Sequence, residues 1–303
     1  MKSGVRRHAP FFCLLLTALL STGANAQDFS SAVTQRLIGG YAYAAAPVWN
    51  HEGFFLWADV PEQKIWKWIP GGQPTLFRDK TDKVIGMAYD ARGDLYLCES
   101  ATGRVMRLTA KPGPLEVVAY AWEGKRLNSP NSVVVRKDGQ VYFTDPAFGS
   151  ANAKRALDFY GVYHLDLDPK HLQPLSIVAK PKGRPNGIAL SPDGRKLYVA
   201  NSDEHALYVY DLAAKTGDVT NERVLVSKIA GVPGGLATDE KGNIYVAARG
   251  VQIYSPEGKL LHTIEFTEQP SDVAFGGAEM NLLMITAGQA IYVTEMPVKG
   301  AQY

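Results

Sequence analysis

Three side chains in this sequence combine types and spacing that could bind a metal ion or activate water. Asn131 and Asn186 each follow a proline, in Pro-Asn-Ser and Pro-Asn-Gly, and Asp272 follows Ser271. Two amides and a carboxylate supply the oxygen ligands that a hard cation such as Ca²⁺ takes in proteins. Asn after proline also stabilises turns, so the residue types alone leave both a ligand site and a purely structural role open.

A repeat determines where these residues lie along the chain. Each lies ten or eleven residues before a short apolar and aromatic run of strand-forming residues, and successive runs begin 40, 46, 56, 47 and 39 residues apart. Most runs follow a turn, and in three of them an Asp-Gly or Lys-Gly pair supplies the positive φ of a tight hairpin. The runs begin at Phe55, Leu95, Val141, Leu197, Ile244 and Leu283, and the aligned positions are Ala45, Ile85, Asn131, Asn186, Gly234 and Asp272.

The length of the repeat predicts an all-β fold, a six-bladed β-propeller. About forty residues and four strands per unit is the size of one blade. The last unit has room for only three strands, ending at residues 290–294. We expect residues 32–37 to supply its fourth strand and to close the ring between the two chain ends. A two-domain β-sandwich and a parallel β-helix fit less well, because neither requires six aligned hairpins at this period.

Propeller geometry predicts where the candidate residues meet. The first strand of each blade lines the central channel, so the six aligned positions should meet at one mouth of it. The second strand returns to the same face, one strand farther out. That places four polar strand-end residues there: Asp59, Glu99, Asp145 and Asn201. Asp145, which precedes Pro146, is expected to bind backbone N–H groups.

The amino-terminal segment reads as a signal peptide, residues 1–26. Lys2, Arg6 and Arg7 precede a mostly apolar run over residues 9–20, and Ala24-Asn25-Ala26 has the small-x-small pattern of a cleavage site. That run is short for a bilayer core of roughly 30 Å, so a retained anchor is the weaker interpretation. We expect a mature chain of residues 27–303, one propeller domain, periplasmic or secreted and without membrane contact after cleavage.

The composition limits the class of partner. With 46% hydrophobic and 20% charged residues, the chain is typical neither of disorder nor of a membrane bundle. Without the basic leader the chain is nearly neutral and has no basic cluster, so nucleic acid is not expected as a partner. The mature chain keeps only Cys98 and therefore forms no internal disulfide. A small molecule is the expected partner, and the sequence does not indicate an oligomeric state.

Several segments together resemble the gluconolactonase/SMP-30 family of six-bladed propellers. They are residues 124–135 with 141–146, residues 184–194 with 197–201, Pro47-Val48-Trp49, Ala274-Phe275-Gly276-Gly277 and Ile285-Thr286-Ala287-Gly288. The resemblance runs in register from about Ala45 to Tyr292. It implies hydrolysis of a lactone ring, assisted by one divalent cation, often Ca²⁺ or Zn²⁺, at the mouth of the pore.

The family's metal ligands are only partly present. The family uses a Glu in blade one, two Asn and an Asp in blade five; the resemblance assigns the Asn pair to Asn131 and Asn186. The Glu position is Ala45, and the Asp position, also a usual candidate for the base, is Gly234. Two neutral amides alone would hold a divalent ion weakly, because affinity rises with ligand charge.

Other positions depart from the family pattern too. Ser132 and Ile85 stand where the family commonly has Asp and Asn, and Ser271-Asp272 stands where it often has Ser-Asn. Asp272 is therefore a candidate relocated metal ligand or base. Glu99 matches a family position near the substrate, and burial could raise its pKa enough for it to act as a general base.

The remaining candidates would bind substrate. Arg184 precedes the Pro-Asn-Gly turn, and Arg249 follows the apolar run of blade five. Both are expected near the mouth, where either could orient a carboxylate or polarise a carbonyl. Ser132 and Asn201 are further candidates for substrate contacts. The insertion at residues 146–160 contains Phe148, Phe159 and Tyr160, and could cover the pocket.

Three functions fit these observations. The first is an exported lactonase-like hydrolase opening a small lactone or related ester, with an altered metal site at Asn131, Asn186 and Asp272, and with Glu99 or Asp272 activating water. The second is a periplasmic binding or accessory propeller that has lost hydrolysis. The third is a metal-free enzyme of another class on the same scaffold.

Overall fold

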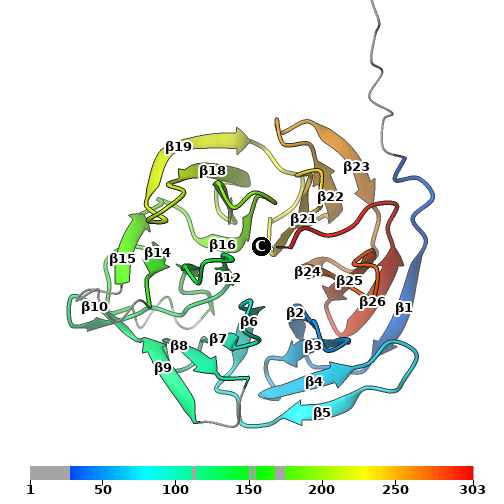
Figure 1. Ribbon diagram of the computed structural model, residues 1–303, viewed down its shortest axis with the longest axis horizontal. Helices are drawn as coiled ribbons and strands as arrows, with labels where there is room; N and C mark the ends of the chain where they lie inside the picture. The colour runs from blue at the N-terminus through cyan, green and yellow to red at the C-terminus, as the bar shows by residue number, and fades with distance from the viewer. Residues whose placement is uncertain (1–27, 111–113, 150–151, 153–154, 168–174, 303) are drawn as a thin grey trace, which may run out of the picture.

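Six antiparallel sheets are arranged radially around a central axis in the computed structural model (Figure 1). The structure describes residues 28–110, 114–149, 152, 155–167 and 175–302, so the expected signal peptide lies outside the described residues. Each sheet has four strands, which confirms the predicted six-bladed β-propeller. Along the described residues no helix has the length and apolar character needed to span a membrane.

The first three blades follow the chain from the inner to the outer strand. Blade one contains β2 (Ala44–Asn50), β3 (Phe54–Asp59), β4 (Lys64–Trp68) and β5 (Thr75–Arg78). Blade two contains β6 (Val84–Tyr89), β7 (Leu95–Glu99), β8 (Arg104–Leu108) and β9 (Leu115–Ala119). A short hairpin, β10 (Ala121–Trp122) and β11 (Lys125–Arg126), leads into blade three. Blade three contains β12 (Val133–Val135), β13 (Val141–Asp145), β14 (Gly161–Leu165) and β15 (Leu175–Ala179).

The other three blades repeat this order until the ring closes. Blade four contains β16 (Pro185–Leu190), β17 (Lys196–Asn201), β18 (Ala206–Leu212) and β19 (Val219–Val226). Blade five contains β20 (Leu236–Thr238), β21 (Ile244–Ala248), β22 (Gly250–Tyr254) and β23 (Leu260–Ile264). Blade six contains β24 (Pro270–Gly276), β25 (Leu282–Ala287), β26 (Ala290–Glu295) and, from the start of the chain, β1 (Thr34–Gly39).

The ring closes as the sequence predicts, between the two ends of the chain. β1 pairs antiparallel with β26, with Thr34 opposite Thr294 and their hydroxyl oxygens 2.9 Å apart. The strand lies two residues farther along the chain than the expected range of 32–37. The closing strand therefore joins the N-terminal segment to the outer edge of the last blade.

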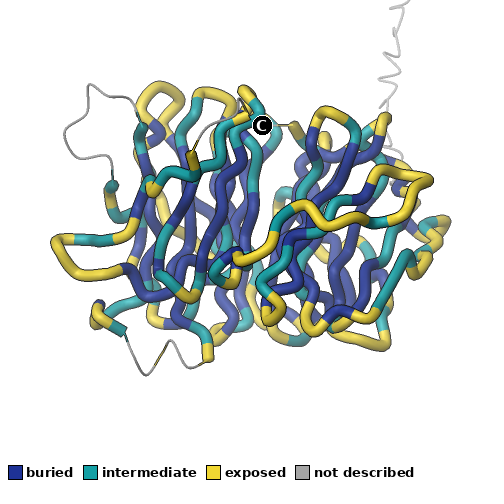
Figure 2. Tube along the Cα trace, turned by 90° about the horizontal axis from the view of Figure 1, so that it is seen from below, coloured by how far each residue is buried: buried dark blue, intermediate teal, exposed yellow. Residues whose placement is uncertain are grey.

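The second strands are apolar on both faces because each blade is packed between two others. Among the described residues, a hydrophobic cluster lies at every one of the six blade interfaces. In β7, Leu95 and Leu97 pack toward blade one, whereas Tyr96 and Cys98 pack toward blade three. A strand buried on both faces reads as a continuous apolar run, which is the pattern that marks each repeat. Figure 2 shows the buried strands inside and the exposed loops at the rims.

Candidate functional site

The six aligned positions meet in one pocket, as the propeller geometry predicts. All six of them line a cavity of about 740 Å³ at one mouth of the central channel. This cavity is called the mouth pocket below. Its other lining residues are Tyr43, Ser132, Phe148, Ser202, Val232, Gly235, Glu268, Gln269, Pro270, Ser271 and Gly288.

A bulge at the start of the first strand helps to aim these side chains. The pairing of first and second strands shifts register between Val84 and Gly86, between Pro185 and Ile188, and between Pro270 and Asp272. A bulge bends a strand locally and re-aims a side chain away from the regular pleat. Blade one has the same irregularity after Ala45. The aligned residues thus lie where the first strands leave regular pairing.

Glycines beside the aligned positions let neighbouring blades approach closely. A Cβ at Gly86 would collide with the backbone oxygen of Asn131, and one at Gly187 would collide with that of Gly234. The backbone nitrogen of Gly187 donates to this Gly234 oxygen at 3.1 Å. Because no side chain keeps these backbones apart, the aligned residues of adjacent blades converge at the channel.

The two asparagines line the pocket with hydrogen-bonding groups that the described residues do not fully engage. The Asn186 Nδ2 donates to Ser202 Oγ at 3.0 Å and more weakly to the Pro233 oxygen at 3.4 Å, which leaves Asn186 Oδ1 without a donor among the described residues. Asn131 is only 8% exposed, yet its side chain has no hydrogen-bond partner among the described residues. The Asn131 amide can therefore bind a ligand or water through both its oxygen and its nitrogen.

The pKa of the Asp272 carboxyl group lies close to neutral pH. Burial raises the pKa of Asp272 to about 7, opposed by one hydrogen bond from the Val273 backbone nitrogen at 2.8 Å. Gly235 makes room for it, because a Cβ at position 235 would overlap the Asp272 carboxylate. Tyr43 lies beside Asp272, and burial together with the Asp272 charge raises the pKa of Tyr43. The pair places a proton acceptor and a hydroxyl in the same pocket.

Arg184 contacts the mouth pocket indirectly, by packing against the ring of a lining residue. Its guanidinium carbon lies 4.9 Å from the centroid of Phe148, which lines the pocket. The same guanidinium pairs with Asp203, with Nη2 and Oδ1 2.5 Å apart, and this pair lowers the pKa of Asp203. Arg184 therefore supports a wall of the pocket and does not line it. Ser132, also predicted to contact substrate, does line it.

Glu99 and Asn201 lie outside the pocket lining, contrary to the roles expected for them. Glu99 is buried, and its Oε2 accepts from Arg104 Nη2 at 2.8 Å and from Thr102 Oγ1 at 2.9 Å. Asn201 is also buried, and its Nδ2 donates to Glu204 Oε2 at 2.6 Å. Both side chains turn into the loop that follows their own strand, so Glu99 is not placed to act as a base in the pocket, nor Asn201 to contact a substrate there.

The other two strand-end residues have the same structural role. Asp145 accepts from the backbone nitrogens of Asn128 at 2.8 Å and Ser129 at 2.5 Å, as the sequence predicts. Asp59 accepts from the Ala42 and Tyr43 nitrogens. Arg249, a further predicted contact, is exposed and is not part of the pocket lining.

Five polar lining residues were not predicted as site residues from the sequence: Tyr43, Ser202, Glu268, Gln269 and Ser271. Tyr43, Glu268 and Gln269 lie in the connections that precede a first strand, where the repeat gives no alignment between blades. Ser202 directly follows the aligned strand end of blade four, so its position could have been found from the repeat.

The oxygen donors of the mouth pocket fit a loosely held hard cation. Asn131, Asn186 and Asp272 offer two amides and one carboxylate. The described residues contain no group of three or more His, Cys, Asp or Glu side chains that could hold a metal ion. One charged ligand gives weak Ca²⁺ affinity, since affinity depends on ligand charge and number.

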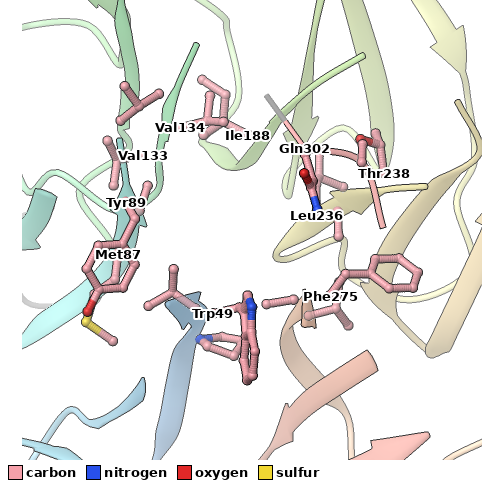
Figure 3. Close-up of a pocket in the computed structure, with 18 of the residues that line it drawn as sticks. Trp49, Met87, Tyr89, Val133, Val134, Ile188, Leu236, Thr238, Phe275 and Gln302 are labelled. Carbon is pink, nitrogen blue, oxygen red and sulfur yellow. The ribbon is translucent and has the colours of Figure 1, made fainter. Parts of the chain in front are cut away.

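A second cavity lies at the opposite end of the channel and has a different character (Figure 3). It measures about 180 Å³, and Trp49, Met87, Ile188 and Phe275 are among the side chains that surround it. The C-terminal segment crosses this end, where the Ala301 nitrogen donates to the Thr238 oxygen at 2.9 Å. No carboxylate lines this cavity, so the candidate chemistry lies in the mouth pocket.

The comparisons with known proteins agree with this architecture. A gluconolactonase of Zymomonas mobilis is 29% identical over 278 residues, which cover 82% of this chain and 77% of that protein. The solved structure of a gluconolactonase from Xanthomonas campestris has a TM-score of 0.81 and 28% identity, covering 90% of this chain and 91% of that one. A calcium-binding protein, regucalcin, from Agrobacterium tumefaciens has a TM-score of 0.71 at 17% identity, covering 87% and 92%, and shares the fold. The family described as SMP-30/Gluconolactonase/LRE-like region matches residues 43–289, and the chain belongs to that family.

Proposed function

We propose that this protein is a hydrolase that opens a lactone ring in the mouth pocket, with Asp272 as the group that activates water. The observation that carries the proposal is the convergence of Asn131, Asn186 and Asp272 in one cavity, with burial raising the pKa of Asp272 to about 7. A base is most useful when its pKa lies near the working pH. The two gluconolactonases similar to this chain over most of its length support lactones as the substrate class.

The chain's own residues can perform each proton transfer. The Asp272 carboxylate takes a proton from a water molecule, whose oxygen attacks the lactone carbonyl carbon. The Asn131 amide has no side-chain hydrogen-bond partner among the described residues and can donate to the oxyanion that forms. The ring C–O bond then breaks, and the departing oxygen takes the proton from Asp272. Water and lactone give one hydroxy acid, and the base returns to its starting state.

A divalent cation, Ca²⁺ or Zn²⁺, fits the same polar residues. Asn131, Asn186 and Asp272 would hold it, and it would polarise the lactone carbonyl when bound. The calcium-binding protein that shares this fold supports a bound cation. Calorimetric titration of the metal-stripped protein with Ca²⁺ and then Zn²⁺ tests this site. No heat and no rise in melting temperature would remove the cation from the proposal.

A lactone panel tests the hydrolysis itself. Wild type, Asp272→Asn and Asn186→Ala are compared on small lactones, with the exposed pocket carboxylate variant Glu268→Gln as a matched control. We expect a fall in kcat of at least about a hundredfold for Asp272→Asn, the usual contribution of a general base. Unchanged rates in both Asp272→Asn and Asn186→Ala would move the chemistry elsewhere.

A non-catalytic propeller is the second candidate, favoured by the small residues at two aligned positions. Ala45 and Gly234 contribute no charge to the mouth pocket. Saturable binding of a lactone or hydroxy acid without turnover on the whole panel would support a binding or accessory protein. Turnover of a different substrate class without any cation would instead indicate a metal-free enzyme.

Export is a separate part of the proposal and depends on residues 1–26. The basic start, the apolar run and Ala24-Asn25-Ala26 support a cleaved leader. We expect the protein recovered from the periplasm or medium of an expressing bacterium to begin at Gln27 by N-terminal sequencing. A chain that keeps Met1 in the cell fraction would contradict this.

A further inference from the structure

The mouth pocket is apolar over much of its wall. Blades one and two contribute Ala45 and Ile85 at their aligned positions, and blade five contributes Gly234, which has no side chain. Other apolar groups line the pocket from two connections between strands and from the first residue of β24. They are Phe148, Val232 and Pro270, and together with Ala45 and Ile85 they are called the apolar wall.

Several of the polar lining groups are already engaged by the protein. Ser202 Oγ donates to the Pro233 oxygen at 2.8 Å, and Ser271 Oγ donates to the Ala44 oxygen at 2.7 Å. Gln269 Nε2 donates to the Val232 oxygen at 3.2 Å. These three groups hold the loops and the next blade in place. Asn131, Asn186 and Asp272 can still bind the reacting ring, and Tyr43, Ser132 and Glu268 are the remaining polar lining residues.

We propose that the pocket selects a lactone that carries an apolar alkyl or aryl substituent over a polyhydroxylated sugar lactone. This inference rests on the proposed lactone hydrolysis and adds the substrate class. The reacting ring lies against Asn131, Asn186 and Asp272, and the substituent lies against the apolar wall.

The physical reason is the change in hydration that each substituent undergoes on binding. A hydroxyl packed against Ile85 or Ala45 loses its water partners and gains none, which costs binding free energy. An alkyl group in the same place gains affinity in proportion to the apolar area removed from water. The cavity of about 740 Å³ leaves space beyond a single six-membered ring for such a group.

Kinetics on a graded series tests the proposal with the full mature chain. The series is δ-valerolactone, δ-hexalactone, δ-octalactone and δ-decalactone, with glucono-δ-lactone as the polar competitor. We expect kcat/KM to rise about threefold for each added methylene until the wall is filled. A flat series, or a kcat/KM for glucono-δ-lactone equal to or above that for δ-decalactone, would overturn the proposal.

Variants of the apolar wall connect the preference to this pocket. Val232 is exposed, so Val232→Thr keeps the shape and adds one hydroxyl without disturbing the core. We expect it to lower the ratio of kcat/KM for δ-decalactone to that for glucono-δ-lactone at least threefold. Ile85→Asn should lower the same ratio further. Val117→Thr, at an exposed valine on the outer strand β9, is the matched control and should leave the ratio unchanged. A shift of the same size in Val117→Thr and Val232→Thr would count against the apolar wall.

Binding of non-hydrolysable lactams separates this proposal from the proposed function. 6-Pentyl-2-piperidinone and gluconolactam are titrated by calorimetry against wild type. Tighter binding of the alkyl lactam by tenfold or more supports the apolar substrate class even if no lactone is hydrolysed, in which case only the catalytic proposal fails. Equal or tighter binding of gluconolactam overturns the substrate class even if lactones are hydrolysed.

Discussion

Gly235 provides the space that the Asp272 carboxylate occupies. The two residues belong to neighbouring blades, and the Gly235 nitrogen donates to the backbone oxygen of Ser271 at 3.0 Å. A Cβ at position 235 would overlap the Asp272 side chain and also crowd its Cα. The carboxylate of Asp272 in blade six can therefore occupy its position only because residue 235 in blade five is a glycine.

Substituting this glycine should damage the site more than the fold. In Gly235→Ala the new methyl group must displace Asp272, because the opposing Cα cannot move freely. We expect kcat for lactone hydrolysis to fall at least about tenfold, since a misplaced base loses much of its effect. Gly72→Ala, at an exposed turn of blade one, is the control and should keep full activity. Full activity in Gly235→Ala would mean that Asp272 is not the base.

The pH dependence of stability should reveal the raised pKa of Asp272. Its folded pKa of about 7 lies above the unfolded value of about 3.9. Between these values the folded state keeps a proton that the unfolded chain loses, so this group makes stability fall as pH rises. Asp272→Asn removes the effect. In metal-free buffer, its melting temperature relative to wild type should be higher at pH 8 than at pH 4. A difference that is constant with pH would contradict the raised pKa of this carboxylate.

The activity profile should respond to the same group. Because the base works only when ionised, the wild-type kcat should rise with pH through about 7. The residual activity of Asp272→Asn should lack this step. Stopped-flow or pH-stat rates between pH 5 and 9, corrected for spontaneous hydrolysis, provide the measurement. An identical step in the variant would assign the titration to another group.

Asp145 should matter for stability. Asp145→Ala leaves the buried nitrogens of Asn128 and Ser129 without an acceptor, which we expect to lower the free energy of unfolding by about 3 kcal/mol. Asp145→Asn keeps one acceptor and should cost less. Urea denaturation measures both, with the exposed Asp79→Ala as the control. A loss in Asp145→Ala no larger than that in Asp79→Ala would refute this structural role.

Arg184 should influence substrate binding more than folding. Its pair with Asp203 is partly exposed, and such pairs contribute about 0–1 kcal/mol to stability. Losing its contact with Phe148 in Arg184→Gln should raise KM a few-fold with little change in kcat or melting temperature. Arg223→Gln, which breaks a similar pair with Asp211 on the outer strands of blade four, is the control and should not change KM. Equal KM values in both variants would exclude the role of Phe148 as a pocket wall.

The ring and its channel could be predicted because the signal is repeated six times. Each second strand is buried on both faces, so its apolar run is long enough to align, and the alignment then fixes equivalent first-strand positions. The repeat therefore predicts that Asn131, Asn186 and Asp272 lie in one pocket, where the structure places them.

Side-chain direction at strand ends could not be predicted in the same way. Glu99 lies on the expected face, but Thr102 and Arg104 from the following hairpin draw its carboxylate away from the channel. The aligned second-strand ends vary in length and charge, so the repeat does not determine their partners. Tyr43 and Glu268 were missed because the connections between blades have no common pattern.

The pairing of β1 with β26 also has a consequence for the order of assembly. β1 lies near the N-terminus and pairs with β26 in the last blade. This pair can therefore form only after nearly the whole chain has been synthesised. If the chain crosses a membrane unfolded and N-terminus first, β1 crosses early and β26 crosses near the end. In that case β1 and β26 can pair, and the propeller ring can close, only after translocation is complete.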